Sequence, residues 1–237
     1  MKEIISLNNV IKNYGQGKVI TKALRGIDLK ITEGDFSVMM GPSGCGKSTL
    51  LNIIGGLDRA TSGDVKFNGK DFNILSNKAL SIMRRQHIGF VFQNYNLLPV
   101  LTAYENAEYV LMLQGIEPTK RREKVMHLFQ EMDLDGLEKR YPRELSGGQQ
   151  QRVAIARAVA SEPQLVLADE ITANVDSETA QSLLQLMAAL NKNNNTTFLF
   201  STHDPAVIKF AKKIIILKDG MISSEKTSSK KIEEFTH

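Results

Sequence analysis

The sequence has a single cysteine, Cys45, so no disulfide can form within the chain, which agrees with a reducing compartment. No apolar run approaches the roughly 18 residues that a membrane-spanning helix needs. The first residues include Glu3 and no continuous apolar stretch, so we expect neither a signal peptide nor a transmembrane segment. The sequence also has no internal repeat. Any role at a membrane would therefore come through a partner.

The 237 residues allow one large core, or one core with a smaller attached subdomain. Lys and Arg exceed Asp and Glu by only four, 30 against 26. Short basic runs are more often solvated faces than nucleic-acid or lipid footprints, so we expect no nucleic-acid partner. The 42% apolar and 24% charged content is typical of a globular protein with a packed core.

The hydrophobic pattern alternates between strands and helices in the first and last thirds of the chain. A Gly-rich turn and a helix follow the third of the early strands. The expected strands cover residues 4–10, 24–31, 35–40, 64–67, 87–92, 164–168, 196–201 and 214–217. The expected helices in these two thirds cover residues 47–54 and 177–190. Such alternation predicts an α/β fold with a mostly parallel sheet covered on both faces.

The middle of the chain, residues 94–160, instead predicts an all-helical insert. Thr102 and Glu105 have the spacing of a capping box for a helix that reaches about Gln114, and Pro118 suits the first turn of the next helix. One apolar face of that second helix combines Val125, Leu128, Phe129 and Met132. Residues 223–237 are polar and are expected to form a mobile tail.

A phosphate-binding loop is the clearest motif. It fits G-x-x-x-x-G-K-[ST], and it lies between an expected strand and an expected helix. Its glycines let backbone N–H groups point at phosphate oxygens, Lys47 would reach the terminal phosphates, and the Ser48 hydroxyl would bind Mg²⁺. We expect a bound nucleotide to contact Gly41, Pro42, Ser43, Gly44, Cys45, Gly46, Lys47, Ser48 and Thr49. Cys45 is at a variable loop position, so we expect no special role for its thiol, with redox sensing as the alternative.

Two carboxylates, Asp169 and Glu170, end an apolar run at residues 165–168. Ligands of α/β folds bind at the carboxyl ends of the strands, so Asp169 would steer Mg²⁺ and Glu170 would activate the attacking water. Taken alone, this pair could equally be two solvated loop residues. The phosphate loop favours the catalytic interpretation.

A second anion site is indicated by Leu145-Ser146-Gly147-Gly148-Gln149. Ser146 and Gln149 have the spacing of a capping box, and the glycines leave N–H groups exposed at the start of a helix. One chain needs one phosphate loop, so this second helix end is expected to serve the nucleotide of another molecule.

This pentapeptide resembles the signature sequence of the ABC transporter ATPase family. Together with the phosphate loop it extends the resemblance over residues 1–222. It implies a P-loop NTPase core with an N-terminal antiparallel β-subdomain and an inserted helical signature subdomain. The chain would be one ABC ATPase domain. Its core would comprise residues 1–93 and 161–222, its helical subdomain residues 94–160, and its tail residues 223–237.

The resemblance also implies further site residues. Tyr14 would stack on adenine, although an isolated Tyr is more often a packing residue. Gln93 would join the Mg²⁺ ligands Ser48 and Asp169, and His203 would contact the γ-phosphate, although a lone His is more often structural. The family therefore assigns catalysis to Lys47, Glu170 and His203.

The signature residues Ser146, Gly147, Gly148 and Gln149 would contact ATP in a head-to-tail, ATP-dependent homodimer. Asn174 and Asp176 match the loop that joins the two sites. Ile171 and Val175 depart from the proline and leucine usual there.

Residues 52–58, 88–99 and 101–106 resemble the subgroup for lipoprotein release, macrolide export and antimicrobial-peptide resistance. Within that subgroup the chain would be an ATPase peripheral to the inner face of the cell membrane, in the cytoplasm, that drives integral membrane permease subunits. Two alternatives are a non-transport member that regulates a membrane partner, as in cell division, and a soluble ABC protein of DNA repair or translation. The latter usually carries two motif sets or a long coiled-coil insertion, and neither occurs here.

Overall fold

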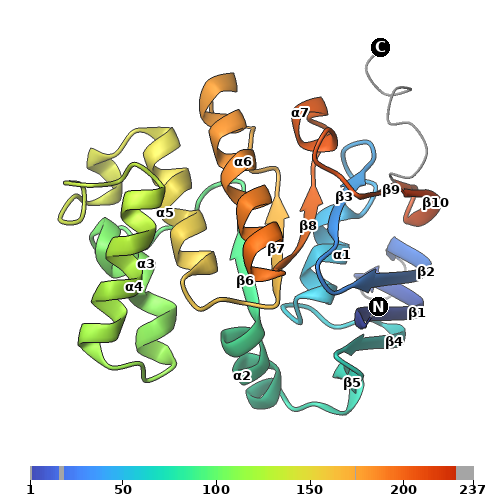
Figure 1. Cartoon of the computed structure of the whole chain (residues 1–237). Helices are drawn as coiled ribbons and strands as arrows, with labels where there is room; N and C mark the ends of the chain where they lie inside the picture. The colour runs from blue at the N-terminus through green and yellow to red at the C-terminus, as the bar shows by residue number, and fades with distance from the viewer. Residues whose placement is uncertain (1, 16–18, 174, 228–237) are drawn as a thin grey trace. The chain divides into compact units, whose positions relative to one another are not determined.

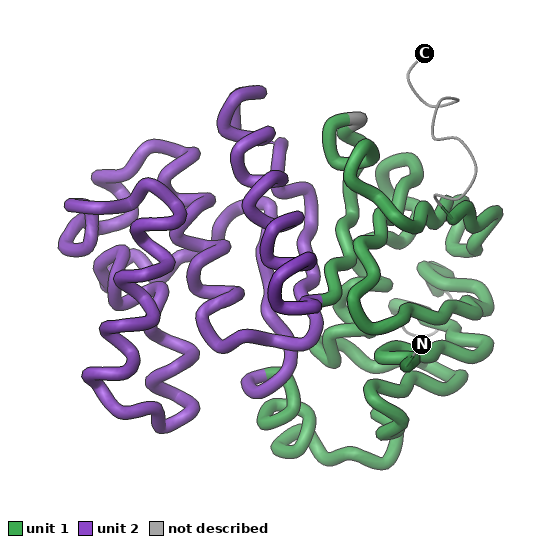
Figure 2. The backbone as a smooth tube through the Cα atoms, viewed as in Figure 1, with its two compact units in different colours: residues 1–84, 197–237 green, residues 85–196 purple. Residues whose placement is uncertain are grey.

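The computed structural model of the chain describes residues 2–15, 19–173 and 175–227. These residues form two compact units. One comprises residues 1–84 and 197–237 and the other residues 85–196, as Figure 2 shows in green and purple. Both units combine strands and helices (Figure 1). The expected α/β class is confirmed.

An antiparallel sheet in the first unit has the order β2–β1–β4–β5. Its strands are β1 (Glu3–Tyr14), β2 (Thr21–Thr32), β4 (Ser62–Phe67) and β5 (Lys70–Asp71). Leu24, Ile27, Leu29 and Ile31 of β2 are buried, while the residues between them are more exposed. This alternation places one face of the sheet on a core and the other in solvent. It confirms the expected N-terminal antiparallel subdomain.

The same unit contains a second run of paired strands in the order β10–β9–β3–β8 (Figure 1). β3 (Phe36–Met40) pairs in parallel with β8 (Thr197–Ser201) and β9 (Lys213–Lys218), whereas β10 (Met221–Thr227) is antiparallel to β9. β3 and β8 are almost wholly buried, with the Phe36 ring 4.6 Å from that of Phe200. Helix α1 (Lys47–Ile54) follows β3, and the short α7 (Pro205–Ile208) follows β8.

The second unit pairs β6 (Ile88–Val91) in parallel with β7 (Leu165–Asp169). Its helices are α3 (Ala103–Leu113), α4 (Pro118–Glu131), α5 (Gly147–Val159) and α6 (Ser177–Asn194). Helices α3, α4 and α5 lie together (Figure 1), with Phe129 fully buried among them. The capping box at Thr102 and Glu105 is present, and Pro118 begins α4, so both helix starts are confirmed.

Three expectations need correction. Helix α2 (Asn77–His87) was not predicted, and it includes His87, which was expected to begin a strand. Strand β10 continues to Thr227, so residues 224–227 of the expected tail are paired with β9, with Thr227 opposite Lys213. Leu128 of the expected buried face of α4 is only half-buried. The boundaries 94–160 of the helical subdomain stay a prediction.

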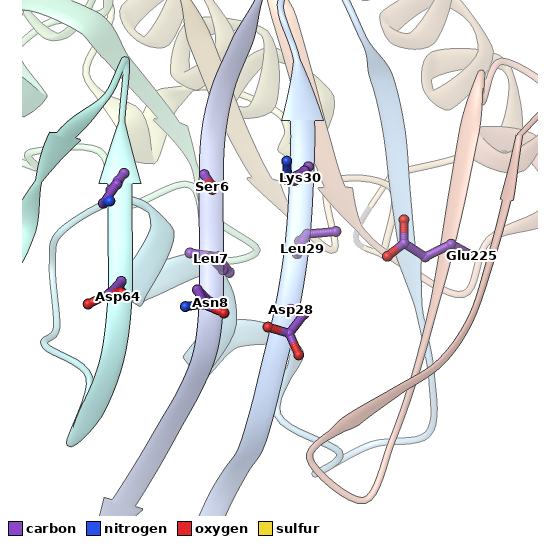
Figure 3. Close-up of a pocket in the computed structure, with 9 residues that line it drawn as sticks. Ser6, Leu7, Asn8, Asp28, Leu29, Lys30, Asp64 and Glu225 are labelled. Atoms are coloured by element: carbon purple, nitrogen blue, oxygen red, sulfur yellow. The ribbon is translucent and has the colours of Figure 1, made fainter.

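The solvent-facing side of the antiparallel sheet contains a hollow of about 540 Å³ (Figure 3). Asn8, Asp28, Lys30 and Asp64 line it from the sheet, together with Glu225 from β10. None of the residues expected to bind ATP lines this hollow, so it is distinct from the candidate site. In the described part of the chain, no helix combines the length and the apolar character needed to cross a membrane.

Candidate nucleotide-binding and hydrolysis site

The phosphate loop connects the buried strand β3 to helix α1. Gly41, Gly44 and Gly46 have φ values of 156°, 77° and 107°, a region that residues with a Cβ rarely adopt. Gly46 is the N-cap of α1, and no side chain among the described residues caps this helix. The first N–H groups of α1 are therefore available to an anion, and the helix dipole adds positive potential there.

Gly41 also lies too close to its neighbours for any larger residue. A Cβ at this position would be 2.1 Å from the Leu217 carbonyl oxygen and 2.7 Å from Cys45 Sγ. Cys45 itself is buried. The loop thus packs against the end of β9, which holds its backbone in the shape that surrounds a phosphate.

Lys47 bends back over the loop that it ends. Its Nζ donates to the carbonyl oxygens of Gly41 at 2.7 Å and Pro42 at 3.2 Å. This ammonium group therefore lies over the curve of the loop, where phosphate oxygens would bind. Ser48 is exposed at the first turn of α1.

The sheet register brings the His203 loop to the same edge as the phosphate loop. Met39 of β3 pairs with Ser201 of β8. Gly41 is two residues after Met39 and His203 is two residues after Ser201, so both follow the same paired position. The Thr202 N–H donates to the Met39 carbonyl oxygen at 3.1 Å, which anchors this loop to β3. His203 is exposed. It lies at the same end of the sheet as the phosphate loop.

Tyr14 ends β1 and is 41% exposed. Its hydroxyl donates to Asp58 Oδ2 at 2.8 Å, and the Lys12 Nζ lies over its ring, 4.7 Å from the centroid. Burial and the hydrogen bond to Asp58 raise the pKa of Tyr14, while a hydrogen bond with Thr49 of α1 opposes this effect. Tyr14 is therefore next to the helix that carries the phosphate loop.

In the second unit, the carboxyl ends of β6 and β7 bring three predicted residues to one edge. Val91 pairs with Ala168 in parallel register, so Gln93 and the Asp169–Glu170 pair follow adjacent strand ends. Gln93 is exposed, and both carboxylates are half-buried. This is the edge at which parallel sheets bind ligands.

Asp169 is suited to a metal ion. Its Oδ1 is buried, and within the described residues it has no hydrogen-bond partner. A buried carboxylate oxygen without a partner is costly unless a cation or water satisfies it. The donor set also fits Mg²⁺, which takes one or two carboxylates with waters and substrate phosphates. No cluster of three or more His, Cys, Asp or Glu side chains that could hold a metal occurs in the described ranges.

Glu170 has a strained backbone. Its φ is 48°, in the left-handed region, where a residue other than glycine costs roughly 1–2 kcal/mol. Strain of this kind often accompanies functional sites, because the surrounding structure fixes the direction of the side chain. β7 ends at Asp169, so this strained residue is the first one beyond the strand.

The signature segment begins α5 with the expected capping box. Ser146 Oγ accepts from the Gln149 N–H at 3.3 Å, and Gln149 Oε1 accepts from the Ser146 N–H at 2.9 Å. A Cβ at Gly148 would be 3.0 Å from Thr179 Cγ2, so the start of α5 lies against the start of α6. Ser146 is exposed, and Gly147 and Gly148 leave the helix end open to an anion.

Asp176 caps α6. Its Oδ1 accepts from the Thr179 N–H at 2.9 Å and its Oδ2 from the Thr179 hydroxyl at 2.7 Å. These hydrogen bonds from Thr179 lower the pKa of Asp176. The structure thus gives Asp176 a capping role beside the signature segment. Asn174, expected in the same loop, lies outside the described residues.

Sequence reasoning missed Arg157, which lies on α5 beyond the signature. Its guanidinium donates to the carbonyl oxygens of Tyr95 and Asn96, in the segment after Gln93, and burial lowers its pKa. A charged residue inside the apolar run Val153–Ala160 was the available signal. Asp58 was missed as a partner of Lys12 and Tyr14, because it lies 46 and 44 residues from them in the sequence.

A phosphate loop between a parallel strand and a helix, with carboxylates at the carboxyl end of another parallel strand, defines a P-loop nucleotide hydrolase. The sequence model of the ABC transporter family matches residues 24–173. The chain therefore belongs to the ABC transporter family.

Two ABC transporter ATP-binding proteins of Methanocaldococcus jannaschii are similar along nearly their whole length. One is 44% identical over 92% of this chain and 97% of its own, and the other, MJ0796, is 45% identical over 94% and 96%. A macrolide export ATP-binding/permease protein MacB of Marinobacter nauticus is 43% identical over 92% of this chain but only 34% of its own.

A solved structure of MJ0796 shows a dimeric post-hydrolysis state bound to ADP and Pi. It superposes on this chain with a TM-score of 0.89 at 43% identity, covering 94% of this chain and 98% of that one. The chain thus has the fold of an ABC cassette, which is a P-loop NTPase fold. The chain is an ATP-binding protein of this family and an ATPase.

Proposed function

We propose that the chain hydrolyses ATP with Mg²⁺ in a head-to-tail homodimer, and that it drives separate integral membrane subunits of an export or force-transmitting complex. The open helix end at Ser146 carries this proposal. The chain has one phosphate loop, on α1, and a second anion site at the start of α5. The dimeric state of the similar cassette MJ0796 supports an arrangement in which the second site serves the partner's nucleotide.

The site residues divide into binding and reacting groups. The loop N–H groups and Lys47 would hold the phosphates, and Tyr14 the base. Ser48, Gln93 and Asp169 would hold Mg²⁺, which supplies charge neutralisation on the phosphate oxygens when it is bound.

The proposed reacting groups would act at the terminal phosphate. Glu170 would accept a proton from the attacking water, and His203 would donate a hydrogen bond to the γ-phosphate. The Ser146 hydroxyl and the N–H groups of Gly147 and Gly148 would complete the site of the opposite subunit, with Gln149 and Asp176 holding that segment. Binding and proton transfer would thus rest on different side chains.

The membrane partner is supported by the MacB relatives, whose ATP-binding and permease parts form one chain and of which this chain matches about a third. An exposed apolar segment follows Gln93, with Val100 78% exposed and Leu98 37%. Asn106 fixes this segment to α3 through hydrogen bonds with Leu98 in both directions and with the carbonyl oxygen of Leu101. We assign it to contact with the membrane subunits, at the inner face of the cell membrane.

A mixing experiment tests the dimer. Lys47→Ala disables the phosphate loop and Ser146→Arg obstructs the signature site, so each homodimer should be inactive. Half of the dimers in an equal mixture are heterodimers with one intact composite site, and activity should recover to about a quarter of wild type. Differently tagged copies show that heterodimers form. Heterodimers without any recovered hydrolysis would contradict the proposal.

A further inference from the structure

The nucleotide base site has a supporting pair behind Tyr14. Lys12 and Tyr14 are two residues apart on β1, so their side chains lie on the same face of the strand. Tyr14 donates to one oxygen of the Asp58 carboxylate at 2.8 Å, and Lys12 Nζ donates to the other at 2.7 Å. The carboxylate therefore bridges the phenol and the ammonium group.

Lys12 also covers one face of the Tyr14 ring, with Nζ 4.7 Å from the centroid. This distance lies within the range of a cation–π contact. The Lys12 side chain is only 12% exposed, and Nζ also donates to the Arg59 carbonyl oxygen at 2.8 Å. With one ring face occupied by a fixed cation, the opposite face is left for a base.

Asp58 is itself firmly anchored in the turn that follows α1. It follows α1 in a turn where the N–H groups of Leu57 and Asp58 donate to the Asn52 carbonyl oxygen. The Arg59 N–H donates to Asp58 Oδ1 at 2.7 Å. Burial opposes ionisation of Asp58, but hydrogen bonds from Lys12, Tyr14 and Arg59 lower its pKa. One end of α1 thus carries the phosphate loop, and the turn at its other end holds the Tyr14 hydroxyl.

We propose that Lys12 and Asp58 are positioning residues for the nucleotide base, which hold the Tyr14 ring so that a purine stacks on its uncovered face. This inference rests on the proposed stacking role of Tyr14. A ring that is fixed before binding loses less conformational entropy when the base arrives, so the pair should strengthen binding without taking part in hydrolysis.

The test separates the base from the phosphates. Kd is measured by calorimetry for ATP and for inorganic tripolyphosphate, both with Mg²⁺, and KM and kcat are measured for ATP hydrolysis. Lys12→Met and Asp58→Asn should raise the Kd and KM for ATP about three- to tenfold, a part of the stacking contribution of one base. The Kd for tripolyphosphate and the kcat should stay within about twofold. Lys66→Met, an exposed lysine on β4, is the matched control and should change none of these quantities.

A double-variant cycle shows whether the pair acts through Tyr14. Lys12→Met should add nothing to Tyr14→Ala, because the ring that it positions is gone. Equal weakening for ATP and tripolyphosphate would overturn the proposal in favour of a purely structural role. Unchanged ATP binding in Lys12→Met, while Tyr14→Ala loses affinity for ATP, would also overturn it. If Tyr14→Ala binds ATP as wild type does, the stacking role of Tyr14 fails, and the positioning role fails with it.

Discussion

Arg157 of α5 donates from Nη2 to the Tyr95 carbonyl oxygen at 2.9 Å, and from Nη1 to the next carbonyl, that of Asn96, at 2.7 Å. Tyr95 and Asn96 have φ values of 59° and 48°, which residues other than glycine rarely adopt. One guanidinium therefore stabilises a strained turn two residues beyond Gln93. The helix that begins at the signature segment is thereby fixed to the Gln93 loop.

Arg157→Met should destabilise the protein, because it leaves these two carbonyl oxygens without their charged donor. Hydrogen bonds to charged groups contribute roughly 1.5–3 kcal/mol each, so the loss of two should lower the free energy of unfolding by about 3–6 kcal/mol. Arg157→Lys retains the charge but not the planar guanidinium with its two donors, so it should recover only part of the lost stability. Urea unfolding measures both. A Lys variant as unstable as the Met variant would show that charge contributes nothing here.

Lys47→Ala should reduce ATP hydrolysis by about two to three orders of magnitude, because it removes the cation over the phosphate loop. The circular dichroism spectrum should match that of wild type, since the Lys47 side chain bonds to carbonyl oxygens of the loop before α1, those of Gly41 and Pro42. Lys70→Ala, at an exposed lysine of β5, serves as the control. Phosphate release at the wild-type rate by the purified Lys47→Ala protein would refute this assignment.

Gly89→Ala should weaken the packing of α5 on β6. A Cβ there would be 2.3 Å from the Ala158 carbonyl oxygen, and such overpacking costs typically 1–3 kcal/mol or more. Gly136→Ala is the comparison, since nothing lies within 4 Å of its Cβ and only its positive φ opposes the change, at roughly 1–2 kcal/mol. Thermal unfolding of both variants measures the difference. A Gly89→Ala protein more stable than Gly136→Ala would contradict the contact.

Much of this architecture was predictable because its signals are local. The capping boxes at Thr102 and Ser146 and the phosphate loop each depend on a few adjacent residues, and all were found. Helix α2 was missed because only Leu80 and Met83 are buried on it, which gives little helical periodicity. Its start did have a signal, since the Ala79 N–H donates to Ser76 Oγ at 3.2 Å.

Other features depend on contacts that no local pattern shows. β10 has exposed or half-buried residues throughout, so its polar sequence has no alternation to distinguish a strand at the sheet edge from a tail. The Tyr14–Asp58 hydrogen bond joins residues 44 positions apart. Both the strand β10 and this hydrogen bond are determined by tertiary contacts rather than by local propensity.

Glu170→Gln should separate binding from hydrolysis. The variant keeps nearly the same shape but cannot accept a proton, so turnover should fall by about 10²–10⁴-fold, while ATP affinity stays near wild type. Because ATP would hold two subunits together until it is hydrolysed, the variant should accumulate as a dimer in ATP, whereas the wild-type chain without nucleotide should be mainly monomeric. Phosphate release and light scattering, each with and without ATP, measure the two effects.

Two outcomes for this variant would be decisive. Hydrolysis close to the wild-type rate would remove Glu170 from the role of general base. An inactive variant that stays monomeric in saturating ATP would agree with Glu170 as the general base, but it would contradict the proposed ATP-dependent dimer.

The burial of Cys45 within the phosphate loop has a practical consequence for spectroscopy and cross-linking. It is the sole thiol in the sequence, and it is only 5% exposed. A cysteine introduced at an exposed position such as Ser146 would therefore be the reactive one toward a maleimide dye or a spin label. Site-specific probes could be attached without first removing a native cysteine, and the phosphate loop would keep its natural sequence throughout.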